Sequence, residues 1–328
     1  MSNPDQNNGH WPDSHINLEA SDLAKLNESL LPVFQQTLSR QNITYDALFD
    51  SALKQVYTPL CSWLVNQQKH SPLILGINGS QGSGKSTLTH ILSDLLEKGF
   101  NKKVVSFSID DLYKTREQRE QLAQTIHPLF KTRGVPGTHD VELGISIIKQ
   151  LLDKTPQNIG IPVFDKSLDD RLSESSWTRV TEPCDIIIFE GWCVGSKAQH
   201  TKDLKPPINN LEEVEDENAV WRKYVNDQLG GQYTELYSHI DILLMLKIPD
   251  FNKVFEWRKL QEEKLRSSLA DKNDTECKIM NDSEINRFIM HYERITRHTL
   301  NEMPERCDIV FELGENHHVK NIITRCKP

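Results

Sequence analysis

The chain contains 328 residues, of which 26% are charged, and it carries a formal net charge of −9. This length allows a sizeable core in one large domain or in two smaller ones. The acidic balance argues against a nucleic-acid partner or an anionic membrane surface, because both favour a basic face on the protein.

The apolar runs and the cysteines indicate the compartment. No apolar run approaches the roughly 20 residues that a transmembrane helix needs, so we expect no membrane-spanning segment. The six cysteines form no C-x-x-C pair. Without a recognisable signal peptide, such cysteines are typical of reduced thiols in a cytoplasmic protein. The oligomeric state is not indicated by the sequence.

The N-terminal part divides into two segments. Residues 1–14 are polar, and we expect them to be a disordered lead-in. Residues 15–70 carry leucines at helical spacing and predict an N-terminal helical region packed on the rest of the chain. Ser71 and Pro72 end this region, and residues 71–328 are predicted to form the main domain.

A complete phosphate-binding loop follows at residues 79–86, where the sequence reads Gly-Ser-Gln-Gly-Ser-Gly-Lys-Ser. An apolar strand at 73–77 precedes it, and a helix opens at about Gly84. A chance match in a glycine-bearing turn is the alternative, but both flanks favour a nucleotide site. In such a loop, Lys85 reaches the β- and γ-phosphates and Ser86 ligates Mg²⁺. The predicted nucleotide-binding residues are Gly79, Ser80, Gln81, Gly82, Ser83, Gly84, Lys85, Ser86 and Thr87.

Strands and helices alternate through the main domain. Further strands are predicted at 103–108, 185–189, 241–248 and 308–312, with helices at 140–152 and 283–301. This order predicts an α/β fold of the P-loop NTPase type, with a mostly parallel sheet flanked by helices on both faces. Ligands of such sheets bind at the carboxyl ends of the strands.

Carboxylates stand at that edge. Asp110 and Asp111 follow the second strand, and Glu190 ends the third strand like a Walker B acid. Asp110 is positioned to accept a proton from an alcohol and to help bind Mg²⁺, and Glu190 to bind Mg²⁺ directly or through water. The alternative is that the Asp pair caps the following helix.

Two later segments differ in character. A helix near 251–271 predicts a lid, in which Arg258 and Arg266 lie near one face and could neutralise a transferred phosphoryl group. Taken alone, the segment also fits a salt-bridged surface helix, and it favours that alternative. Residues 201–218 contain prolines and then acidic residues, which predicts a solvated surface insertion.

Two loops supply basic side chains for an acceptor. They carry Arg133, His139, Lys166 and Arg171. Such a set suits a small anionic substrate, because arginine matches the geometry of a carboxylate. Tyr113, at the end of the Asp-Asp segment, joins these predicted acceptor residues. His139 and Asp140 could equally begin a helix as its cap.

These motifs together resemble the D-glycerate 3-kinases, members of the phosphoribulokinase, uridine kinase and pantothenate kinase group of P-loop kinases. The resemblance covers essentially residue 72 to the C-terminus. It is carried by residues 79–86, 108–113, 133–140, 162–167, 189–192, 257–262 and 292–297.

The resemblance implies the chemistry of the site. It makes Asp110 the base and Glu190 the Mg²⁺-binding acid, and it implies an ATP- and Mg²⁺-dependent kinase that converts D-glycerate to 3-phosphoglycerate. Lys85 and Arg258 complete the catalytic candidates. The chain departs from the family at Leu112, where Phe is usual, and residues 292–297 resemble a microbial and fungal branch.

Other functions remain open. The same kinase could phosphorylate a nucleoside, pantothenate or another sugar acid, and a nucleotide-binding regulator is a different class. A GTPase switch would carry an Asn-Lys-x-Asp motif, which the sequence lacks. A degenerate scaffold would have lost some of the loop and carboxylate residues, but Lys85, Ser86, Asp110 and Glu190 are all present.

Overall fold

The structure is a computed structural model. It describes residues 5–7, 10–12, 15–16, 18–69, 72–153, 155, 158–270 and 280–325, without the side chains of 5–7 and 264–270. Most of the predicted lead-in, the side chain of Arg266 and the end of the predicted lid at residue 271 therefore lie outside the described residues.

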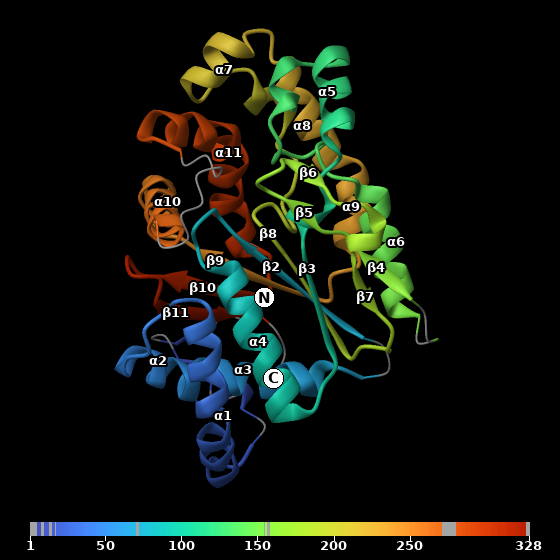
Figure 1. The fold of residues 1–328 in the computed structure, drawn as a ribbon. Coiled ribbons are helices and arrows are strands. Elements are labelled where there is room, and N and C mark those ends of the chain that lie inside the picture. Colours follow the sequence, from blue (N-terminus) through green and yellow to red (C-terminus); the bar gives the residue numbers. More distant parts are fainter. Residues whose placement is uncertain are drawn as a thin grey trace.

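A central sheet organises the main domain (Figure 1). Its strand order is β1-β11-β10-β9-β2-β8-β3, and the run from β10 to β3 is parallel throughout. The predicted strands and the predominantly parallel sheet are confirmed, but β11, which pairs antiparallel with β10, was missed. The bounds are β1 (Asp5–Asn7), β2 (Leu73–Gly79), β3 (Val104–Ser108), β8 (Ile186–Gly191), β9 (Ile242–Lys247), β10 (Ile309–Leu313) and β11 (Val319–Thr324).

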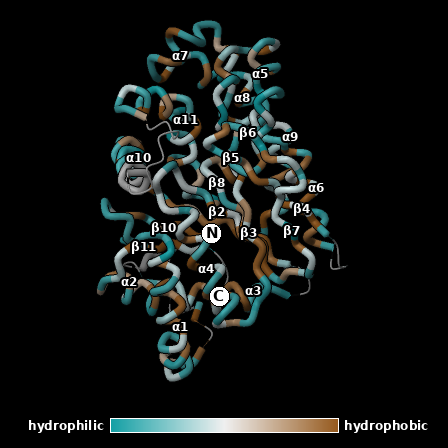
Figure 2. The backbone as a smooth tube through the Cα atoms, viewed as in Figure 1, coloured by the Kyte–Doolittle hydropathy of each residue, from teal (hydrophilic) through white to brown (hydrophobic). Residues whose placement is uncertain are grey.

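Helices cover both faces of the sheet because its strands are apolar on both sides. In β8, Ile186 and Ile188 pack into one hydrophobic cluster, whereas Ile187 and Phe189 pack into the other. The outer helix α5 (Arg116–Thr125), by contrast, is mostly hydrophilic (Figure 2). One cluster receives α1 (Ala20–Arg40), α3 (Thr58–Gln67) and α4 (Lys85–Phe100), and the other receives α6 (Val141–Leu152), α8 (Val220–Gly230) and α9 (Gln232–Ser238).

The remaining elements lie around this core. Helix α11 contributes to both clusters, through Ile285 and Ile289 on one side and Tyr292 and Ile295 on the other. No helix within the described ranges is long and apolar enough to cross a bilayer. The elements outside the central sheet and its two helix layers are α2 (Ala47–Ala52), the π-helical turn η2 (Leu53–Tyr57), α5 (Arg116–Thr125), α7 (Asn210–Glu215), α10 (Asn252–Ala270), α11 (Asp282–Glu302), β4 (Ile159–Ile161), β5 (Phe164–Asp165), β6 (Asp170–Arg171) and β7 (Thr178–Val180).

The N-terminal segment is more ordered than its polar sequence predicts. Strand β1 pairs antiparallel with β11 at the edge of the sheet. Trp11 is 2% exposed, and its ring centroid lies 5.6 Å from that of Trp63 in α3. Part of residues 1–14 is therefore not a disordered lead-in, because a tryptophan buries its large apolar surface and an edge strand accepts a further partner.

The acidic insertion at 201–218 is also not simply solvated. Glu212 is fully buried, and it accepts a hydrogen bond from Arg294 Nε of α11 at 2.7 Å. Asp216, 2% exposed, lies 3.0 Å from Arg222 Nη1 of α8. Most of residues 201–218 are exposed, as predicted, but Glu212 and Asp216 are not. The local pattern did not reveal that Glu212 has an arginine partner on α11, 82 residues later in the chain.

We expect Glu212→Gln to lower the free energy of unfolding by about 3–5 kcal/mol, because it leaves the Arg294 guanidinium buried without its counter-charge. Glu215→Gln is the matched control, since it removes a carboxylate from the more exposed pair with Arg287 and should change stability by less than about 1 kcal/mol. Denaturant unfolding measures both variants. Equal, small effects would show that the buried pair does not fasten the insertion.

Candidate active site

The phosphate loop connects β2 to α4 in the required geometry. Gly82 and Gly84 adopt positive φ angles of 80° and 91°, which side-chain-bearing residues disfavour. A Cβ atom on Gly82 would lie 2.7 Å from Cβ of Trp257 in α10. The loop thus needs glycine both for its backbone conformation and for the close approach of the predicted lid helix.

Lys85 and Ser86 face the mouth of this loop. The Lys85 ammonium donates to the Ser80 carbonyl at 3.1 Å, and burial lowers the Lys85 pKa against the opposing charges of Glu190 and Asp110. The Ser86 hydroxyl donates to Glu190 Oε1 at 3.0 Å. The structure therefore brings together the predicted phosphate lysine and two of the three predicted Mg²⁺ ligands, Ser86 and Glu190.

Glu190 fits a magnesium site. Its side chain is 7% exposed, and within the described part of the chain its buried Oε2 atom has no hydrogen-bond partner. Among the described residues no group of three or more His, Cys, Asp and Glu could enclose a metal. Mg²⁺ commonly uses one or two carboxylates together with substrate phosphates and water, so the Oε2 atom of Glu190 suits it as a ligand.

Strand register places these groups at one edge of the sheet. Glu190 stands opposite Ile77 of β2 on one side and Ser108 of β3 on the other. The Asn78 amide donates to the carbonyls of Trp192 at 3.2 Å and Val194 at 2.8 Å, fixing the segment after β8. Asn78 was not among the predicted site residues, although it is a polar residue inside an otherwise apolar strand.

The two aspartates after β3 have separate roles. Asp111 accepts a hydrogen bond from the Ser108 amide at 2.9 Å and so caps the 3₁₀ turn at Ile109–Leu112. Asp110 instead accepts from the Tyr113 hydroxyl at 2.7 Å and from Lys166 Nζ at 2.9 Å. The capping alternative therefore describes Asp111, and Asp110 is directed towards the site.

Electrostatics separate the two carboxyls further. Burial alone would raise the pKa of Asp110, but the charge and hydrogen bond of Lys166, with the bond from Tyr113, hold it well below its usual range. Burial raises the pKa of Asp111 to about 6. Asp110 is thus ionised throughout the neutral range.

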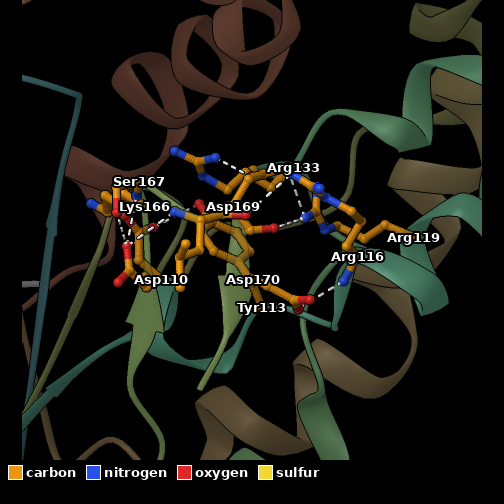
Figure 3. Close-up of polar contacts among 12 residues, drawn as sticks. Asp110, Tyr113, Arg116, Arg119, Arg133, Lys166, Ser167, Asp169 and Asp170 are labelled. Carbon is orange, nitrogen blue, oxygen red and sulfur yellow. Dashed lines mark hydrogen bonds and ion pairs between the residues drawn. The ribbon is translucent and has the colours of Figure 1, made fainter. Parts of the chain in front are cut away.

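Three of the predicted basic residues of the acceptor site lie at the short β5–β6 hairpin: Lys166 and Arg133, labelled in Figure 3, and Arg171 of β6. Lys166 bridges to Asp110, and Arg133 forms an ion pair with Asp169. Arg171 Nη1 lies 3.0 Å from Asp140 Oδ2. The sequence did not show that each of these basic side chains has an acidic partner.

His139 lies inside the protein rather than on its surface. It is 1% exposed, its ring stacks on Tyr113 at 4.7 Å, and its Nδ1 atom lies 2.6 Å from the Tyr233 hydroxyl. Burial lowers its pKa to about 3, so the ring is neutral. The cap of α6 is Asp140, which accepts from the Leu143 amide at 3.2 Å. His139 therefore packs against the Tyr113 ring and helps to hold it in place.

Arg258 projects from α10 and is engaged within the protein. It pairs with Glu262 on its own helix and donates to Gln261 Oε1 at 3.0 Å. Its guanidinium also lies over the Phe288 ring of α11, 5.3 Å from the centroid. These contacts suit a salt-bridged surface helix, and they equally suit a lid helix whose arginine is held beside α11.

A cavity of about 460 Å³ adjoins the phosphate loop. Its walls include Gly82 of the loop, Phe49 of α2 and Trp257 of α10. His317, from the β10–β11 turn, stacks on Trp257 at 4.0 Å, and its Nε2 atom lies 2.9 Å from the Gly82 carbonyl. The N-terminal helices thus border the candidate nucleotide site, a role that the sequence did not indicate.

Comparison with known proteins finds relatives of this chain. No family model matches the chain. It is 32% identical over 257 residues to the uncharacterized kinase mug58 of Schizosaccharomyces pombe, covering 74% of this chain and 87% of that protein. It is 31% identical over 229 residues to the chloroplastic D-glycerate 3-kinase of Arabidopsis thaliana, covering 67% of this chain but 46% of that protein.

A solved structure agrees at the level of the fold. The D-glycerate 3-kinase of Cryptococcus neoformans var. grubii superposes with a TM-score of 0.63 at 22% identity, over 93% of this chain and 100% of that one. The expected fold and kinase class are confirmed. The chain belongs to the family of P-loop kinases that includes the D-glycerate 3-kinases.

Proposed function

We propose that this kinase uses ATP and Mg²⁺ to phosphorylate a hydroxyl of D-glycerate, giving 3-phosphoglycerate. The observation that carries the proposal is the meeting of Lys85, the Ser86–Glu190 pair and Asp110 at one sheet edge, beside Arg133 and Lys166. The glycerate-kinase relative supports this choice of acceptor.

The nucleotide would bind across the phosphate loop. Its phosphates would meet the loop backbone and the N-terminus of α4, whose partial positive charge favours anions. Lys85 would neutralise the β- and γ-phosphates, and the neighbouring cavity would receive the nucleoside. Gln81, Ser83 and Thr87 complete the proposed contacts.

Ser86 and Glu190 would hold the magnesium ion, which would neutralise charge on the phosphates. Asp110 was also a predicted metal ligand. Asp110 would act as the base, from a position where its carboxylate accepts hydrogen bonds from Tyr113 and Lys166, and its part in binding the metal stays a prediction. Arg258 would add positive charge at the γ-phosphoryl group as it transfers.

In the proposed transfer step, Asp110 would accept the proton that the acceptor hydroxyl releases. The acceptor hydroxyl loses its proton to the Asp110 carboxylate while its oxygen forms a bond to the γ-phosphorus. The bond from that phosphorus to the bridging oxygen breaks, and ADP leaves. Lys166 would move from Asp110 towards the reacting groups, and Arg133 would bind the acceptor carboxylate.

We also propose a cytoplasmic location. The described cysteines, Cys61, Cys184, Cys193 and Cys307, are buried free thiols. Burial raises the pKa of Cys193 to about 12, so this thiol resists oxidation and disulfide exchange.

The acceptor is tested by ADP release with D-glycerate, L-glycerate, glycerol, uridine and pantothenate. We expect the highest kcat/KM with D-glycerate and poor turnover of glycerol, because glycerol lacks the carboxylate that Arg133 would bind. Preferential turnover of uridine or pantothenate would overturn the glycerate assignment and leave the kinase family membership intact.

The two aspartates provide matched variants for the base. Asp110→Asn should lower kcat by about 10²–10⁴-fold with little change in ATP binding, because it removes the proton acceptor. Asp111→Asn, the control, keeps an oxygen that can cap Ser108 and should retain most of the activity. If the Asp111 variant is the more damaged of the two, the base has been placed one residue too early.

A further inference from the structure

The tip of the β5–β6 hairpin carries a carboxylate that no predicted role uses. Asp169 forms an ion pair with Arg133 Nη1, and its Oδ2 atom lies 3.0 Å from Arg119 Nη2 (Figure 3). Its backbone has a φ angle of 53°, in the left-handed region that Asp and Asn tolerate better than most residues. Arg116 Nη2 lies 4.0 Å from the same Oδ2 atom, so three arginines converge on one carboxylate within a tight turn.

Arg119 fixes this turn in place. Its side chain is 1% exposed, and its guanidinium donates to the carbonyls of Lys114 at 3.3 Å, Lys131 at 2.9 Å and Asp169 at 2.6 Å. A guanidinium so deeply buried and so fully bonded cannot reach a substrate. Asp169 is thus held in place by Arg119 through both its backbone carbonyl and its carboxylate.

Arg133 differs from Arg119 because part of it faces the acceptor region. Its side chain is 25% exposed, and its guanidinium lies over the Phe164 ring at 5.4 Å. Asp169 binds Nη1, and the structure shows no hydrogen bond from Nε or Nη2 to any described residue. The anchored carboxylate therefore determines how the remaining edge of Arg133 is oriented.

We propose that Asp169 is a positioning residue that sets acceptor specificity: it holds Arg133 so that its remaining edge can make a two-pronged contact with an acceptor carboxylate. The inference rests on the proposed function in that the acceptor carries a carboxylate. A planar guanidinium forms both hydrogen bonds to a carboxylate only when the two groups are correctly oriented. Fixing the acceptor in this way aligns its hydroxyl with Asp110.

A double-mutant cycle in the full-length protein tests this inference. Its members are the wild type, Asp169→Asn, Arg133→Lys and the double variant, compared by kcat/KM for D-glycerate. Asn suits the left-handed backbone and keeps a hydrogen-bond acceptor, so Asp169→Asn removes mainly the charge. Glu215→Gln is the control, because it removes a carboxylate from an arginine pair on the remote insertion.

We expect Asp169→Asn to lower kcat/KM about 10-fold and Arg133→Lys about 100-fold, and the double variant to equal Arg133→Lys alone, because contacting residues couple. The loss in Asp169→Asn should fall mainly on kcat, with the KM for ATP unchanged. If Asp169 had a purely structural role, Asp169→Asn would lower the thermal midpoint of unfolding, and its effect on kcat/KM would multiply with that of Arg133→Lys. Effects that multiply to about 1,000-fold would overturn the inference.

The wild-type result separates this inference from the proposed function. If the wild type phosphorylates pantothenate instead of glycerate, the cycle is measured with pantothenate, which also carries a carboxylate. Non-additivity there would keep the role of Asp169 while the glycerate assignment fails. If the wild type accepts only neutral alcohols, both proposals fall.

Discussion

The site depends on the parallel pairing of β8 with β2 and β3. This register sets Glu190 opposite Ile77 on one side and Ser108 on the other, so that the strand ends meet beside the phosphate loop. A slip of one residue would turn the Glu190 side chain to the opposite face of the sheet and separate it from Ser86. The apolar side chains that alternate along β8 oppose such a slip, because every one of them would change cluster.

Charge pairing is the second constraint on the site. The sequence suggests a pocket with an excess of free basic side chains, but Lys166, Arg133 and Arg171 pair with Asp110, Asp169 and Asp140. The proposed recognition of an anion would therefore depend on the direction of the remaining donors more than on net charge. In the proposed mechanism the Lys166–Asp110 pair would couple recognition to catalysis, since the lysine that lowers the pKa of Asp110 is itself a candidate acceptor contact.

The sequence pattern predicted those features that depend on residues close together in the chain. Strand length, helical periodicity and the glycine-rich loop predicted the sheet, α6, α11 and the loop at Gly82 and Gly84, because each depends on neighbours in sequence. The partners of charged side chains could not be predicted in this way. Asp169 meets Arg119 across 50 residues of chain, and Glu212 meets Arg294 across 82, so their burial follows from tertiary packing. His317 reaches Gly82 through β11, a strand that the sequence analysis missed.

The most direct test of this account is a crystal structure with ADP, Mg²⁺ and D-glycerate bound. The account predicts that the glycerate carboxylate contacts the Nε and Nη2 edge of Arg133, that its terminal hydroxyl faces Asp110, and that Lys166 leaves Asp110. The metal should lie against Ser86 and Glu190. A glycerate bound away from Arg133, with Lys166 still paired to Asp110 and the terminal hydroxyl pointing elsewhere, would contradict the account.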